Sequence, residues 1–162
     1  MTEPRWLKIA RRHIGLREIK GPKHSSAIIG WLKKLGAWWS NDEEAWCGTA
    51  VASWMMEAAL PYPKDWYRAK AWADYGSNLR PERLAPGAIL VFARKGGGHV
   101  GLYVGEDSLY YHVLGGNQND AVNIARIAKS RCIATRWPKG EPVIGKPVIL
   151  SANGTPVTTS EA

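Results

Sequence analysis

The fold of this chain is indicated most clearly by residues 86–114, which read PGAILVFARKGGGHVGLYVGEDSLYYHVL. Three apolar runs lie in this stretch, and turns rich in glycine or containing proline bound them. Short runs of β-branched and aromatic residues between turn residues are typical of paired β-strands. Two more such runs follow, so we predict strands over residues 88–92, 99–104, 109–114, 122–127 and 132–137. Their hairpin spacing predicts an antiparallel meander in a five- to six-stranded sheet.

The part of the chain before this stretch has the spacing of helices instead. Apolar side chains recur three and four residues apart over 4–14 and 25–35, which predicts two amphipathic helices. A third predicted helix, over 46–59, is apolar on most sides and therefore indicates a central, buried element. A shorter helix is predicted over 65–75. Helices followed by an antiparallel sheet define an α+β domain.

The composition fits one compact domain. The chain has 162 residues, 45% of them apolar, and can bury a core without disulfides. We assign residues 1–150 to a single domain and residues 151–162, which are rich in Ser and Thr, to a disordered tail. The two cysteines, Cys47 and Cys132, do not have the spacing of a disulfide scaffold. We interpret Cys132 as a small core residue.

The formal net charge of +8 favours polyanionic partners, such as nucleic acid or an anionic cell envelope. The basic residues are scattered and form no arginine-rich arm, so the sequence does not indicate specific nucleic-acid binding. No segment resembles a secretory signal or is long and apolar enough to span a bilayer. We therefore expect synthesis as a soluble cytoplasmic chain.

Cys47 is the most informative single residue. It lies in Ala45-Trp46-Cys47-Gly48-Thr49-Ala50-Val51, where a polar stretch gives way to the third predicted helix. The first turn of a helix offers unpaired N–H groups and the positive end of the dipole, which lower the pKa of a thiol. Cys47 is therefore a candidate nucleophile. The alternative interpretation is a structural cysteine buried on an apolar helix.

A histidine and an amide side chain follow in an order that suits thiol chemistry. His99 opens a predicted strand after three glycines, where its imidazole could act as general base and acid for Cys47. Asn117, in Gly115-Gly116-Asn117-Gln118, could hold the second ring nitrogen of that imidazole. The two residues after Asn117 are rival candidates, and the same stretch also suits a simple turn.

No cofactor site is indicated. The sequence has no Cys-x-x-Cys or His-x-x-x-His spacing, no phosphate loop and no dinucleotide motif. The run Asn41-Asp42-Glu43-Glu44 lacks the alternating spacing of a calcium loop, and we predict instead that it caps the helix of Cys47. The sequence therefore predicts neither a metal nor a cofactor.

In these features the chain resembles the peptidoglycan hydrolases of the CHAP and NlpC type, which are papain-like thiol hydrolases. The similarity extends over residues 5–138. The Gly-Gly-Asn-Gln stretch of the chain resembles the signature of a small phage-associated subfamily. The matching stretches are Trp46-Cys47, Pro86-Gly87, Gly98-His99-Val100-Gly101-Leu102-Tyr103-Val104-Gly105, Gly115-Gly116-Asn117-Gln118 and Arg136-Trp137-Pro138. The chain departs from relatives at Ala88, Ala50 and Gly115, where an acidic residue, a bulky aromatic and a glutamate respectively occur among them.

The resemblance implies a papain-like α+β fold and cleavage of an amide bond in the peptide part of bacterial peptidoglycan, by an amidase or an endopeptidase. Cys47 would attack the carbonyl, His99 would shuttle the proton and Asn117 would orient His99. The substrate contacts would come from Trp46, Gln118 and Gly98. The implied protein is a monomeric phage endolysin for host lysis. It would be made in the host cytoplasm without a signal peptide and would act in the periplasm or cell wall after release.

Alternatives from other classes stay open at this point. A secreted antibacterial effector would use the same chemistry. A non-catalytic envelope-binding module of a virion would keep the fold without the reaction. A basic nucleic-acid binder would show salt-dependent DNA binding that does not need Cys47.

Overall fold

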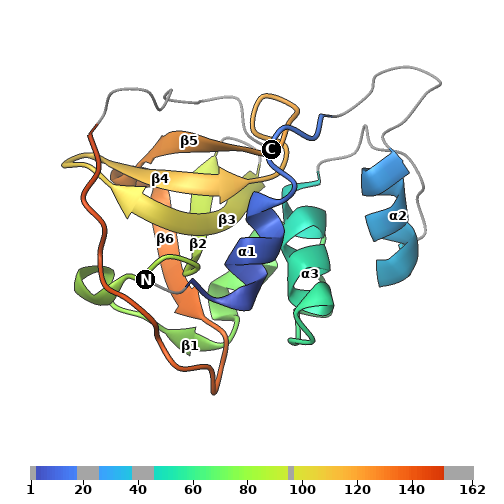
Figure 1. Cartoon of the computed structure of the whole chain (residues 1–162), viewed down its shortest axis with the longest axis horizontal. Helices are drawn as coiled ribbons and strands as arrows, with labels where there is room; N and C mark the ends of the chain where they lie inside the picture. Colours follow the sequence, from blue (N-terminus) through green and yellow to red (C-terminus); the bar gives the residue numbers. More distant parts are fainter. Residues whose placement is uncertain (1–2, 18–25, 38–45, 95–96, 152–162) are drawn as a thin grey trace.

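The computed structural model describes residues 3–17, 26–37, 46–94 and 97–151 and has an α+β architecture. Within these ranges, three α-helices precede the main strands: α1 (Arg5–Arg11), α2 (Ser26–Leu35) and α3 (Cys47–Glu57). Figure 1 shows α1 and α3 beside the sheet and α2 outermost. Helix α3 packs against α1, α2 and the sheet, so it is the central helix that its apolar sequence predicts.

The helices confirm the predicted positions with shorter bounds. Every residue of α3 from Cys47 to Met55 is buried, which explains why this helix is apolar on most sides. The helix predicted over 65–75 is instead a shorter 3-10 helix, η1 (Ala69–Asp74). Two further 3-10 turns are η2 (Pro81–Arg83) and η3 (Lys129–Arg131). The predicted cap over 41–44 and nearly all of the predicted tail, 152–162, lie outside the described residues.

The described strands form one antiparallel sheet in the order β1-β6-β2-β3-β4-β5. Their bounds are β1 (Ser77–Asn78), β2 (Ile89–Arg94), β3 (Gly97–Glu106), β4 (Tyr110–Gly115), β5 (Asn123–Ala128) and β6 (Cys132–Trp137). The predicted antiparallel sheet is confirmed, but a simple meander describes only β2 to β5. Strand β6 returns to pair with the other edge of β2, and β1 is too short to leave a pattern in the sequence.

A tryptophan anchors α1 to the start of the sheet. The indole N–H of Trp6 donates to the carbonyl of Gly87 at 2.8 Å, and its ring meets Trp137 edge-on with centroids 5.2 Å apart. Gly87 has a φ of +101°, and a Cβ there would meet the Pro4 ring at 2.5 Å. The turn before β2 therefore requires glycine both for its backbone conformation and for the close approach of α1.

The segment after β6 returns to the sheet near the end of β3. The backbone N–H of Glu106 donates to Val148, and that of Leu150 donates to Glu106, each at 2.8 Å. The N–H of Val148 also donates to the Tyr103 hydroxyl at 3.1 Å. These contacts hold the segment against the end of β3.

Candidate active site

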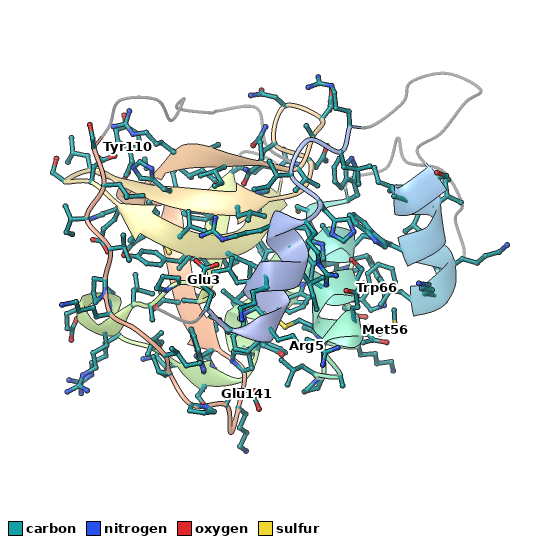
Figure 2. All side chains as sticks on the ribbon, viewed as in Figure 1. Glu3, Arg5, Met56, Trp66, Tyr110 and Glu141 are labelled. Carbon is teal, nitrogen blue, oxygen red and sulfur yellow. The ribbon has the colours of Figure 1, made fainter. Side chains whose placement is uncertain are left out.

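Cys47 lies where the helices meet the sheet. It is the first residue of α3, and 3% of its surface is exposed. The next residue, Gly48, packs against the backbone carbonyl of Trp66, which is labelled near α3 in Figure 2. This close approach leaves no room for a Cβ at position 48. The backbone amide of Val100, on β3, lies close enough to the sulfur to lower the pKa of the thiol. Val100 directly follows His99, so Cys47 lies next to the strand that carries the predicted imidazole.

Burial dominates the ionisation of Cys47. Loss of solvent raises the pKa of its thiol above the ordinary value of 9.0. Hydrogen bonds from the backbone amides of Val100 and Gly48, and the positive charge of Arg94, act in the opposite direction and are smaller. The backbone amides at the helix start do lower this pKa, as predicted, but burial outweighs them and the net shift is upward. The thiol is protonated near neutral pH, so its attack on a substrate needs a base.

His99 lies on β3 with no exposed surface, and a single side chain holds one of its ring nitrogens. Its Nε2 atom lies 2.9 Å from Oε1 of Gln118. The amide nitrogen of Gln118 donates to the carbonyls of Val113, at 3.2 Å, and Asn123, at 2.9 Å, and to Oδ1 of Asn123, at 2.9 Å. In return, the Asn123 side chain donates to the carbonyl of Gln118 at 2.9 Å.

This network fixes the tautomer of His99. The nitrogen of the Gln118 amide must face its three acceptors, so the oxygen must face the imidazole. An oxygen can only accept, and Nε2 of His99 therefore carries the hydrogen. In the neutral imidazole this leaves the lone pair on Nδ1, which makes Nδ1 the basic atom. A histidine held in one tautomer by an acceptor is prepared for general-base chemistry.

Asn117 does not take the orienting role for which it was the leading candidate. Its backbone φ is 58°, in the left-handed region that asparagine tolerates better than most residues. The hydrogen bond to Nε2 of His99 comes from its neighbour Gln118, one of the two rivals that the sequence left open. Asn117 therefore supplies the turn that carries Gln118 inward. The sequence could not separate these roles, because both residues have a primary amide.

The two glycines before Asn117 provide the space that this arrangement needs. A Cβ at Gly115 would lie 2.5 Å from Oε1 of Gln118 and 3.2 Å from Nε2 of His99. A Cβ at Gly116 would lie 2.7 Å from the Trp46 ring. The Gly-Gly-Asn-Gln stretch is thus explained by packing: two positions without side chains, one left-handed turn and one buried amide.

The burial of two predicted substrate contacts argues against direct contact with substrate. Trp46 is 1% exposed and packs against Gly116 and Trp31, so its ring supports the site from within the core. Gln118 has no exposed surface, and its amide is already hydrogen-bonded on both sides. Gly98 is half-buried on β3, and its predicted contact with substrate stays a prediction.

A second cluster of titratable groups, which the sequence did not indicate, lies at the turn between β3 and β4. Oδ2 of Asp107 accepts from Nε of Arg126 at 2.8 Å and lies 2.9 Å from Nε2 of the fully buried His112. The hydrogen bond from Arg126, joined by the one to His112, holds the pKa of Asp107 well below its ordinary value of 3.8. This cluster ties the turn to β5 and uses no residue of the Cys47 site.

Other chemical features of the described residues are few. Both cysteines are free, and Cys132 is partly buried, with its thiol donating to the carbonyl of Ala134 at 3.4 Å. Burial raises the pKa of Cys132 to about 11. Within the described ranges, no three His, Cys, Asp or Glu side chains are grouped closely enough to hold a metal ion. None of the helices described is long and apolar enough to cross a membrane.

Comparison of the chain with protein-family models and with curated protein sequences finds no match. The chemistry of the site therefore has to be argued from its own geometry.

Proposed function

We propose that this protein is a thiol hydrolase that cleaves an amide bond in the peptide part of bacterial peptidoglycan. The observation that carries the proposal is the placement of Cys47, at the start of α3, next to the strand whose residue His99 is held in one tautomer by Gln118. A nucleophile, a base and a group that orients the base are the parts that acyl transfer needs.

The geometry supports the following reaction. Nδ1 of His99 accepts the proton of the Cys47 thiol as the sulfur bonds to the carbonyl carbon of the substrate. The backbone N–H of Cys47, at the start of the helix, is a candidate donor to the oxyanion. The C–N bond then breaks, and the leaving amine takes the proton from His99. Water, activated by His99, cleaves the thioester and restores the thiol.

Gln118 supports the charged form of His99 during this cycle. The Nε2–H group donates to a neutral amide oxygen, which keeps the ring oriented in both protonation states. Because burial raises the pKa of Cys47, the free enzyme holds a neutral thiol rather than a thiolate near neutral pH. Proton transfer then accompanies attack.

We propose peptidoglycan as the substrate, and the cell envelope as the place of action, from the resemblance to CHAP and NlpC-type enzymes. The net charge of +8 also suits an anionic envelope. Within that class, the proposed role is that of a phage endolysin acting as an amidase or an endopeptidase. A secreted effector with the same chemistry would share every residue named above.

The burial of Cys47 favours one other candidate, a non-catalytic module that binds the envelope. A thiol that is 3% exposed, with a raised pKa, is also what an inert structural cysteine would show. A fixed tautomer alone does not exclude this candidate, because the buried His112 is held by Asp107 in a similar way. What favours the hydrolase is that His99 lies on the strand next to the start of α3, where Cys47 is found.

Mass spectrometry of digested peptidoglycan tests the proposal. Purified sacculi are incubated with wild-type protein and with Cys47→Ala, and circular dichroism confirms that both are folded. Soluble fragments from wild type alone support thiol catalysis, and their masses identify the bond. No fragments from either protein would reject the hydrolase for this substrate and favour the binding module. Fragments from both would remove Cys47 from the mechanism.

A further inference from the structure

A pocket of about 320 Å³ lies between α2 and α3, which Figure 1 shows side by side. The described residues that line it come from these two helices: Trp31, Lys34, Ser53, Trp54, Met56 and Glu57. An α-helix rises by about 1.5 Å per residue, so Trp54 lies about 10 Å along α3 from Cys47. This spacing allows one polymeric substrate to contact both the pocket and the candidate nucleophile.

Trp54 brings an unsatisfied hydrogen-bond donor to the wall of this pocket. Its side chain is 1% exposed, and its indole N–H has no hydrogen-bond partner among the described residues. By contrast, the indoles of Trp6, Trp72 and Trp137 each donate to a backbone carbonyl, at 2.8, 3.0 and 3.0 Å. A buried donor without an acceptor is costly, and buried polar groups in native proteins are nearly always paired. The pocket is therefore a place where a ligand can supply the missing acceptor.

The residue before Trp54 adds a complementary acceptor. Ser53 is 5% exposed, and its hydroxyl donates to the carbonyl of Ala50, one turn earlier in α3, at 2.7 Å. That hydrogen bond uses the one hydrogen of the hydroxyl, so Oγ can only accept from a ligand. The pocket wall thus carries one N–H donor and one oxygen acceptor on adjacent residues. An uncharged secondary amide, with one C=O and one N–H, matches both.

The rest of the lining favours one kind of secondary amide. Trp31 and Met56 supply apolar surface, and the exposed side chains of Lys34 and Glu57 add charged groups that can bind hydroxyls. A peptide amide continues as a chain on both sides. An acetamido group is instead a short side arm that ends in a methyl group, so it can enter a pocket from one side. Its methyl group and the C–H face of a sugar ring suit indole and thioether surface.

We infer that this pocket binds the acetamido group of an N-acetylated sugar. The indole N–H of Trp54 donates to the acetamido carbonyl, and Oγ of Ser53 accepts from the acetamido N–H. This inference rests on the proposed function, because the glycan strands of peptidoglycan carry N-acetylated sugars, and it adds a second contact with the same polymer. The pocket holds the glycan while Cys47 acts on the peptide that the glycan carries.

Isothermal titration calorimetry of the full chain with three probes tests the pocket. Chitotriose carries an acetamido group on each sugar, and cellotriose has the same sugar backbone without these groups. Trialanine has peptide amides and no sugar. We expect saturable binding of chitotriose, and binding of the other two probes that is weaker by about tenfold or more, since each lacks part of the matching group.

Two variants assign that binding to the pocket. Trp54→Phe keeps an aromatic ring and removes the N–H, and Ser53→Ala removes the acceptor. Each should weaken chitotriose binding by about three- to tenfold, the range expected for one uncharged hydrogen bond. Trp137→Phe is the matched control, because it makes the same change at an indole outside the pocket and should bind chitotriose like wild type. Ser53→Ala tests the pocket on its own if Trp54→Phe does not fold.

The outcomes separate the pocket from the proposed reaction. The pocket would be overturned by equal affinity for chitotriose and either other probe, by chitotriose binding that neither variant weakens, or by no saturable binding. Cleavage of sacculi by wild type would leave the hydrolase intact in each of these cases. Chitotriose binding that depends on Trp54 and Ser53, in a protein that does not cleave sacculi, would uphold the pocket and reject the hydrolase in favour of the envelope-binding module.

Discussion

The carboxamide oxygen of Gln118 and Nε2 of His99 lie 2.9 Å apart in the buried centre of the candidate site. The hydrogen bonds of the Gln118 nitrogen to Val113 and Asn123 leave the oxygen no other direction. This contact therefore determines which nitrogen of His99 is basic.

We expect Gln118→Met to lower kcat by about 10- to 1,000-fold, because the imidazole loses the acceptor that fixes its tautomer while the volume of the side chain is nearly kept. KM should change little, since Gln118 has no exposed surface with which to contact substrate. Steady-state kinetics on a defined peptide measures both constants.

Asn117→Gly is the matched control for that variant. Glycine tolerates the φ of 58° at this position, so the substitution removes the amide without straining the turn. Activity close to wild type would agree with the structure. A loss as large as that of Gln118→Met would return the orienting role to Asn117.

We expect Gly115→Ala to lower kcat while the protein stays folded. The new methyl group would lie 2.5 Å from Oε1 of Gln118 and 3.2 Å from Nε2 of His99, so one of the two must move. Gly30→Ala is the control, because a Cβ there meets nothing within 4 Å and lies inside α2. That control should raise stability by about 0.5–1 kcal/mol in thermal unfolding. Full activity of Gly115→Ala would show that the contact has no catalytic role.

We expect the Cys47 thiol to be alkylated slowly by iodoacetamide near neutral pH and faster as pH rises. Burial raises its pKa above 9.0, so the reactive thiolate appears only in alkaline solution. Mass spectrometry of the peptide that contains Cys47 measures the rate. The Cys47→Ala variant, in which Cys132 is the remaining cysteine, shows how much of the alkylation of the whole protein comes from Cys132. A rate that is already at its plateau below about pH 7 would indicate a preformed thiolate–imidazolium pair instead.

We expect Asp107→Asn to destabilise the protein most near neutral pH. The folded state lowers the pKa of Asp107 below 3.8, so its stabilising effect is present above that value and is lost as pH falls through the folded pKa. Urea unfolding of wild type and variant across the acid range measures the difference, which should shrink toward low pH. The exposed Asp74, changed to Asn, should show no such trend. A difference independent of pH would assign the effect to packing.

The sequence by itself determined the order and type of most elements. Helical periodicity located α1, α2 and α3, and turn residues between apolar runs located β2 to β6, because these patterns depend on neighbours close in the chain. It also selected Cys47, His99 and the Gly-Gly-Asn-Gln stretch as the candidate functional residues.

Tertiary structure alone decided how those residues act together. The choice of Gln118 over Asn117 depends on a left-handed turn and on hydrogen bonds to Asn123, neither of which leaves a pattern in the sequence. The raised pKa of Cys47 has the same origin: a helix start is a local feature, but desolvation depends on every element packed around the thiol. The return of β6 to β2 likewise follows from strand pairing between distant parts of the chain.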